Sequence, residues 1–126
     1  MQKQVDIDHF VSWALYPLDL GHNFVLAHRN CNLAKRDRLA SEEHLQAWVE
    51  RNRSLGARLA TEFDRIEMLH NLPSTTRIAY WAYSAASTIC GLTWHTRETL
   101  VPLRGDWQAL LTMEPETAIG QSLTKV

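Results

Sequence analysis

Four side chains between residues 8 and 32 are of the types that assist the hydrolysis of a phosphodiester bond. They are Asp8, His9, Asn23 and Asn32. The charge of a phosphodiester repels the nucleophile and its leaving oxygen is poor, so hydrolysis needs a base for water and a divalent ion on the phosphate. An imidazole, with an ordinary pKa of about 6.5, can be that base near neutral pH. We therefore expect His9 to act as the general base.

A divalent ion can be held at such a site by few protein ligands. Mg²⁺ prefers hard oxygen ligands and keeps several waters, so one carboxylate and one amide oxygen are sufficient. Asp8 and Asn32 can provide this pair. Neighbouring strand residues point to opposite faces, so Asp8 and His9 can converge on one phosphate only where the strand is twisted or irregular.

The surrounding sequence predicts a strand, a loop, a second strand and a helix. Residues 4–11 alternate with a period of two, and a short apolar run occupies residues 23–28. Between them, residues 16–21 contain Pro, Asp and Gly at positions that favour a turn. A short helix is expected to open at residue 31 or 32 and to end at residue 38.

Lys35, Arg36 and Arg38 are expected on the exposed side of this short helix. They lie close to the proposed site in sequence, so they can contact the phosphates of a nucleic acid. Asp37 partly neutralises the cluster, and an ordinary solvated helix face has equal weight as an interpretation.

Three further helices are expected in the rest of the chain. Ser41 can cap a helix over residues 41–52, Gly56 lies near a break, and apolar residues then recur at helical spacing over 59–69. The third helix begins at Pro73-Ser74 and ends at Cys90-Gly91, where Gly suits a C-terminal cap. Its expected apolar face consists of Ile78, Trp81, Ala82 and Ala85.

The last part of the chain has weaker signals. Residues 92–103 are rich in Thr, Val and Trp and predict an extended or hairpin-like segment. Asp106 can begin a short helix, and residues 114–126 have too little periodicity to place. The remaining histidines are interpreted as surface or structural residues, with His22 in a loop. Three tryptophans could stack on bases but are interpreted as core residues: Trp48, Trp81 and Trp94.

Composition limits the class of protein. The 126 residues, with 45% hydrophobic content, predict one compact domain or a small domain with a subdomain. The net charge of -1 argues against a strongly basic polyanion binder. Cys31 and Cys90 are far apart and form neither a CxxC pair nor a disulfide framework, so we expect a cytoplasmic location. Because no apolar run approaches about 18 residues, no membrane partner is expected.

The motif of Asp8-His9, then Asn23, then Cys31-Asn32-Leu33-Ala34-Lys35 resembles the bacterial HNH endonucleases of the ββα-metal fold. The resemblance covers roughly residues 4–53. The individual residue types are common, so its specificity comes from the order and spacing of the motif residues together.

The resemblance implies a division of roles. His9 would be the general base, while Asp8 and Asn32 would hold the metal. Asn23 would hydrogen-bond the backbone of the loop and keep the base oriented. Lys35 would contact a phosphate of the nucleic-acid backbone or support the metal site.

Two departures from the family pattern matter. Ser12 stands where many relatives have Pro, which implies a less rigid turn after the base. Many relatives also carry cysteine pairs that bind a structural zinc, whereas this region keeps only Cys31. The chain is therefore either a zinc-free branch or a portion that lacks an upstream part of the module, and we favour the second.

We expect an α+β protein with a small ββα-metal module over residues 1–53 and a mainly helical region, with a possible short hairpin, over 54–126. Its expected function is the hydrolysis of phosphodiester bonds in DNA with one Mg²⁺ or Mn²⁺ ion and a His base, and without structural zinc. The alternative is a catalytically degenerate module that binds nucleic acid or a protein. A helical adaptor is a third hypothesis, but residues 54–126 show no motif that distinguishes it. The oligomeric state stays open.

Overall fold

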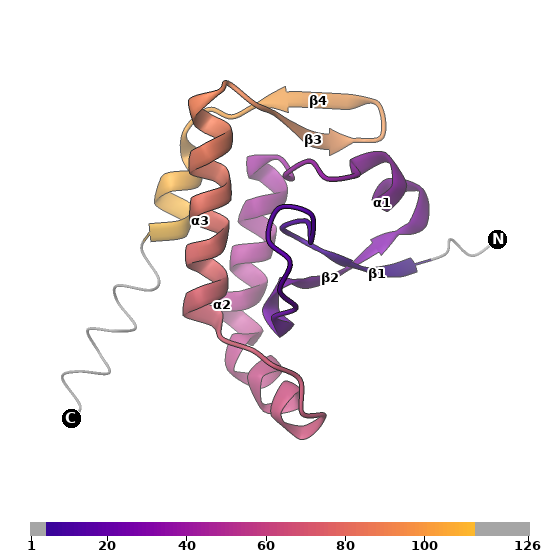
Figure 1. Ribbon diagram of the computed structural model, residues 1–126, viewed down its shortest axis with the longest axis vertical. Helices are drawn as coiled ribbons and strands as arrows, with labels where there is room; N and C mark the ends of the chain where they lie inside the picture. Colours follow the sequence, from indigo (N-terminus) through magenta and orange to yellow (C-terminus); the bar gives the residue numbers. More distant parts are fainter. Residues whose placement is uncertain (1–4, 113–126) are drawn as a thin grey trace.

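The protein mixes helices and strands in an α+β arrangement, shown in Figure 1 as a computed structural model that describes residues 5–112. The elements in chain order are β1 (Val5–His9), the 3-10 turn η1 (Gly21–Asn23), β2 (Phe24–His28), α1 (Arg29–Lys35), α2 (Glu42–Arg65), α3 (Leu72–Thr88), β3 (Leu92–Thr96) and β4 (Thr99–Pro102). Residues 106–112 are helical, as expected from Asp106. The expectation for residues 114–126 lies outside the described range.

The first unit is an antiparallel hairpin followed directly by a helix. Val5 pairs with His28 and His9 pairs with Phe24, so the predicted order of strand, loop, strand and helix is confirmed. Helix α1 begins earlier than predicted and stops at Lys35 rather than at residue 38. The cause of the early stop is Arg36, whose φ of 55° cannot continue a right-handed helix.

Helix α2 runs without the break that was predicted near Gly56. A Cβ at this position would lie 3.0 Å from Leu72 Cδ2, so the glycine permits a close approach of the chain that begins α3. The Gly56 carbonyl also accepts a hydrogen bond from His22 Nε2 at 2.9 Å. The glycine is therefore a packing position inside the helix and not its end.

Helix α3 ends differently from the prediction. The residue in the left-handed region is Cys90, with a φ of 52°, and the Gly91 amide then donates to the Ala86 carbonyl at 2.9 Å. The buried face is also rotated from the predicted one, because Trp81 and Ala85 point to solvent. The buried side chains of this helix are Thr75, Ala79, Ala82 and Tyr83.

The predicted extended segment after α3 is confirmed as the hairpin β3–β4. Its Trp94 pairs with the chain that enters α2, because the Trp94 amide donates to the Leu39 carbonyl and the Trp94 carbonyl accepts from the Ser41 amide, both at 2.8 Å. The second hairpin is thereby tied to the N-terminal end of α2, beside which it lies in Figure 1.

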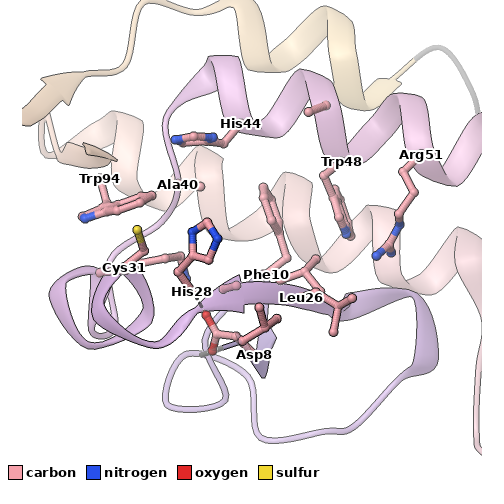
Figure 2. A pocket seen from close by; sticks show the side chains of 15 residues that line it. Asp8, Phe10, Leu26, His28, Cys31, Ala40, His44, Trp48, Arg51 and Trp94 are labelled. Atoms are coloured by element: carbon pink, nitrogen blue, oxygen red, sulfur yellow. Dashed lines mark ion pairs between the residues drawn. The ribbon is translucent and has the colours of Figure 1, made fainter. Parts of the chain in front are cut away.

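A groove of about 610 Å³ separates the first hairpin and α1 from α2 (Figure 2). Its lining is mostly apolar and includes Trp48 and Trp94. Arg51 lies at one end of the groove in Figure 2 and forms hydrogen bonds with the backbone. Its guanidinium donates to the carbonyls of His22 at 2.6 Å and Phe24 at 2.7 Å. This arginine therefore links the first hairpin to α2.

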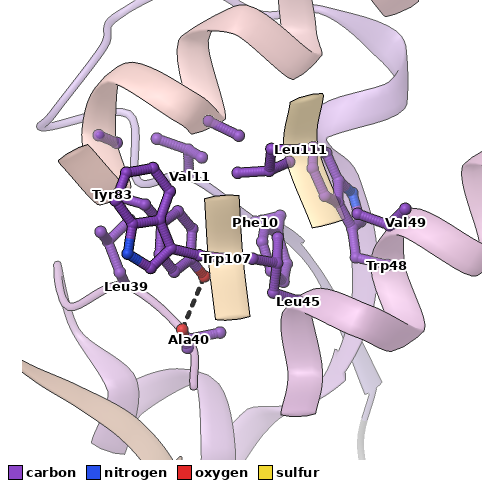
Figure 3. Close-up of a cluster of buried hydrophobic side chains, with 12 residues drawn as sticks. Phe10, Val11, Leu39, Ala40, Leu45, Trp48, Val49, Tyr83, Trp107 and Leu111 are labelled. Carbon is purple, nitrogen blue, oxygen red and sulfur yellow. Dashed lines mark hydrogen bonds between the residues drawn. The ribbon is translucent and has the colours of Figure 1, made fainter. Parts of the chain in front are cut away.

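One hydrophobic core joins the two ends of the described chain (Figure 3). Phe10 and Val11 pack in the same cluster as Tyr83 and Trp107. The Tyr83 hydroxyl donates to the Ala40 carbonyl at 2.6 Å, and burial raises the pKa of this phenol. The proposed division at residue 53 falls inside α2, so the two predicted regions share both a helix and a core.

Glu42 is a buried carboxylate at the start of α2 that holds the start of the last helical segment. It accepts hydrogen bonds from the backbone amides of Arg104, Gly105 and Trp107 at 2.7, 3.0 and 2.9 Å. A helix leaves its first amides without intrahelical partners, and a carboxylate satisfies them well. Glu42 therefore fixes residues 104–112 onto α2.

We expect Glu42→Ala to lower the free energy of unfolding by about 2–4 kcal/mol, because it leaves three backbone amides, including the buried amide of Trp107, without an acceptor. Glu43→Ala is the matched control, since Glu43 occupies the same helical turn but is exposed and pairs with His95 at 3.3 Å. Its expected cost is about 1 kcal/mol or less. Urea denaturation measures both, and equal costs would contradict the role of Glu42.

His22 is only 1% exposed, which corrects its interpretation as an ordinary loop residue. Its Nδ1 has no hydrogen-bond partner among residues 5–112, and its ring packs edge-on against Phe63. Burial lowers the pKa of His22 below the ordinary value of 6.5, because the imidazolium would lose its hydration. The folded protein therefore disfavours protonation of this ring.

The lowered pKa of His22 predicts acid sensitivity. The unfolded chain binds the proton more readily, so stability is fully present above about pH 6.5 and falls as the pH drops below that value. We expect urea unfolding at about pH 7.5 and about pH 5 to show this loss, and His22→Gln to reduce it. His28→Gln, at an exposed position, is the control. An unchanged pH dependence in His22→Gln would refute the prediction.

Candidate functional site

Asp8, His9 and Asn32 line one open depression of about 670 Å³ on the surface of the first hairpin and α1. Asp8 and His9 come from the end of β1, and Asn32 comes from the middle of α1. Asn23 does not line the depression; it is the last residue of the turn η1, directly before β2. Three of the four predicted residues therefore share a surface, and the fourth lies behind it.

Asp8 and His9 both lie in the regularly paired part of β1, opposite Val25 and Phe24, and both line the depression. Regular pairing of β1 stops at His9, and the next two residues, Phe10 and Val11, are both buried. A regular strand would place them on opposite faces. The irregularity of the strand therefore begins after the two site residues and does not lie between Asp8 and His9.

Asn23 holds the backbone directly after the strand. Its Oδ1 accepts from the Val11 amide at 2.8 Å, and its Nδ2 donates to the Val11 carbonyl at 2.9 Å. The Phe10 amide also donates to the Asn23 carbonyl at 2.7 Å. These bonds satisfy the polar groups of a buried segment and fix the chain that leaves His9.

Asp8 and Asn32 lie within hydrogen-bond distance of each other. With its amide nitrogen toward Asp8, Asn32 donates to Oδ2 at 2.8 Å and to Oδ1 at 3.0 Å. This orientation satisfies both side chains, because an amide oxygen in that place would face only acceptors. The pair is therefore near enough to act on a single ion.

Lys35 is buried, with 7% of its surface exposed, so its expected place on the exposed side of the helix is wrong. Its Nζ donates to the His9 carbonyl at 3.4 Å and lies 4.0 Å from Asp8 Oδ2. Burial lowers the pKa of Lys35 and outweighs the opposing effect of Asp8 and Asp37. Of the two roles that the family resemblance implied, support of the site fits this position better than phosphate contact.

Asp19 is a site residue that the sequence interpretation missed. His9 Nε2 lies 2.8 Å from Asp19 Oδ1, in the loop between the two strands. A carboxylate accepts only, so Nε2 carries the proton in this bond, and in the neutral ring Nδ1 is the nitrogen with the lone pair. No motif spacing marks Asp19, because a loop has no periodicity, and its residue type had been explained by turn formation.

The basic residues beside the site differ in their positions. Arg36 is exposed and lines the depression, and Arg38 is exposed near it in sequence. Asp37, between them, accepts a hydrogen bond from the Ser12 hydroxyl at 3.1 Å, which ties the loop after β1 to the end of α1. The depression itself therefore carries both signs of charge.

Within residues 5–112, no group of three His, Cys, Asp or Glu side chains is placed to hold a metal ion. The described part of the chain also contains no helix long and apolar enough to cross a membrane. Comparisons with protein-family models, with curated proteins and with solved structures find no match. The function is therefore inferred from the geometry of the site.

We expect Asn23→Ala to release the backbone after His9 and to cost about 2–4 kcal/mol, because the buried amide and carbonyl of Val11 both lose their partner. Hydrogen exchange should then show the Val11 amide opening faster relative to the amides of α2. Asn71→Ala is the control, since it removes the N-cap of α3 at a cost of about 1 kcal/mol. If both variants changed the exchange of the Val11 amide equally, Asn23 would not be the residue that holds this backbone segment.

Proposed function

We propose that this protein is a divalent-metal-dependent endonuclease of the HNH type, which hydrolyses phosphodiester bonds in DNA. The observation that carries the proposal is the convergence of Asp8, His9 and Asn32 on one open depression, with Asp8 and Asn32 in direct reach of each other. The order of hairpin and helix supports an assignment of residues 5–35 to a ββα-metal unit.

The residues present fit a hard divalent cation. Asp8 and Asn32 would hold it through one carboxylate and one amide oxygen, and the open depression leaves room for the waters that Mg²⁺ or Mn²⁺ retains. When bound, the ion would polarise the phosphate and stabilise the leaving oxygen. Lys35 Nζ, 4.0 Å from Asp8, offsets part of the carboxylate charge, so the ion has to compete with this ammonium.

His9 would act as the general base through Nδ1. The Asp19 carboxylate accepts a hydrogen bond from Nε2 and so favours the neutral tautomer whose Nδ1 can take a proton from water. Phe24 supports the ring from a centroid distance of 4.8 Å, and Asn23 fixes the backbone behind it. Asp19, Phe24 and Asn23 are positioning residues in this scheme, while Arg36 and Arg38 would contact phosphates beside the cut.

Plasmid cleavage with Mg²⁺ or Mn²⁺ tests the proposal. We expect His9→Ala, Asp8→Ala and Asn32→Ala each to lower the rate by about 10²-fold or more, since general-base catalysis alone supplies about 10²–10⁴-fold. Asp19→Ala should lower it less, because His9 then keeps its place but loses its partner. EDTA should abolish cutting by the native protein.

His28→Ala is the matched control for this assay, because His28 is an exposed histidine on the same hairpin that does not line the depression. Its rate should equal that of the native protein. Equal activity of the native protein, His9→Ala and Asn32→Ala would reject the assigned roles. DNA binding without cutting by the native protein would instead support the non-catalytic alternative.

A further inference from the structure

Trp13 is an exposed aromatic side chain at the edge of the proposed reaction centre. It has 54% of its surface exposed and lines the same depression as Asp8, His9 and Asn32. A large apolar ring in water is unfavourable, and exposed apolar groups beside a polar site often mark a binding surface. No motif or periodicity in the sequence singles out Trp13.

The backbone around Trp13 is held in place. The Ser12 hydroxyl accepts from the Ala14 amide at 3.2 Å and donates to Asp37 at 3.1 Å. The amides of Leu15 and Tyr16 both donate to the Ser12 carbonyl, at 2.9 and 3.1 Å. Trp13 is therefore presented by a hydrogen-bonded turn, and binding a ligand against it requires little ordering of the chain.

The charges of the depression offer limited attraction to a polyanion. Besides Asp8 and His9, its charged lining residues are Arg36 and Asp37, while Leu33, 67% exposed, adds a second apolar side chain. Phosphate contacts depend on an excess of positive charge, which this lining does not have. Stacking of a base on an aromatic ring does not depend on such an excess.

We propose that Trp13 is a stacking platform for an unpaired nucleobase next to the scissile phosphate, and that the preferred substrate is single-stranded DNA or an unpaired segment of a duplex. This inference rests on the proposed nuclease function. The faces of a paired base are covered by its neighbours, so stacking on Trp13 would require unstacking of a duplex, whereas an unpaired base has a free face.

Binding measurements separate this inference from cleavage. Fluorescence anisotropy, with EDTA present to prevent cutting, compares a labelled single-stranded oligonucleotide with a duplex of the same sequence. The native protein should bind the single strand more tightly. Trp13→Ala should weaken that binding by about 5- to 100-fold, the range expected for one stacked base. Trp13→Phe keeps an aromatic face and should retain most of the affinity.

Trp81→Ala is the matched control, because Trp81 is 53% exposed but contacts Tyr16 and does not line the depression. Its affinity for the single strand should equal the native value. The inference is overturned if the native protein and Trp13→Ala have equal affinity for the single strand, or if neither binds it measurably. It is also overturned if the native protein prefers the duplex. His9→Ala should bind the single strand with the native affinity. If this variant also cuts DNA at the native rate, the catalytic proposal is rejected, while the binding test of Trp13 stays valid.

Discussion

The burial of Phe10 and Val11 directly after His9 is the constraint on which the candidate site depends. Phe10 stacks on Trp48 with a centroid distance of 4.5 Å and an interplanar angle of 4°, and Val11 is 1% exposed. Two consecutive buried residues end the alternation of β1, and the buried backbone that results needs hydrogen-bond partners. Asn23 supplies them from the start of β2. The same anchoring that secures the hairpin to the core therefore determines where Asp8 and His9 lie.

The electrostatic balance around Asp8 follows from this packing. The carboxylate lies beside the amide of Asn32 and within 4.0 Å of the buried Lys35 ammonium, whose pKa is lowered by loss of hydration. A separation of 4.0 Å is at the long limit of an ion pair, and Lys35 also donates to the His9 carbonyl. The lysine thus stabilises the end of the strand, while the closer partner of both Asp8 oxygens is the Asn32 amide. A shorter bond would have committed the carboxylate to the lysine.

The sequence predicts this arrangement unevenly. The hairpin and α1 could be predicted because alternation, turn residues and motif spacing coincide there. Asp8, His9 and Asn32 line one depression, while their convergence on one ion and their catalytic roles stay predictions. Asp19 and Trp13 could not be found, because the conformation of the loop after β1 is determined by hydrogen bonds at Ser12 that have no periodic signature. The face of α3 was misjudged at Trp81 because a large apolar residue was taken for a core residue, whereas the smaller Ala79 and Tyr83 are the buried ones.

The attachment of the first hairpin to α2 explains why a boundary at residue 53 does not separate an independent unit. A two-stranded hairpin is at best marginally stable alone in water. Here the His22 carbonyl accepts from Trp48 Nε1 at 3.0 Å and from Arg51 at 2.6 Å, while His22 itself donates to Gly56 beyond the boundary. Trp48 and Arg51 lie within one turn of α2, and Gly56 lies more than one turn farther along the helix. The long helix therefore supports the turn that leads into β2, and the proposed reaction centre needs residues of α2 that the motif itself does not contain.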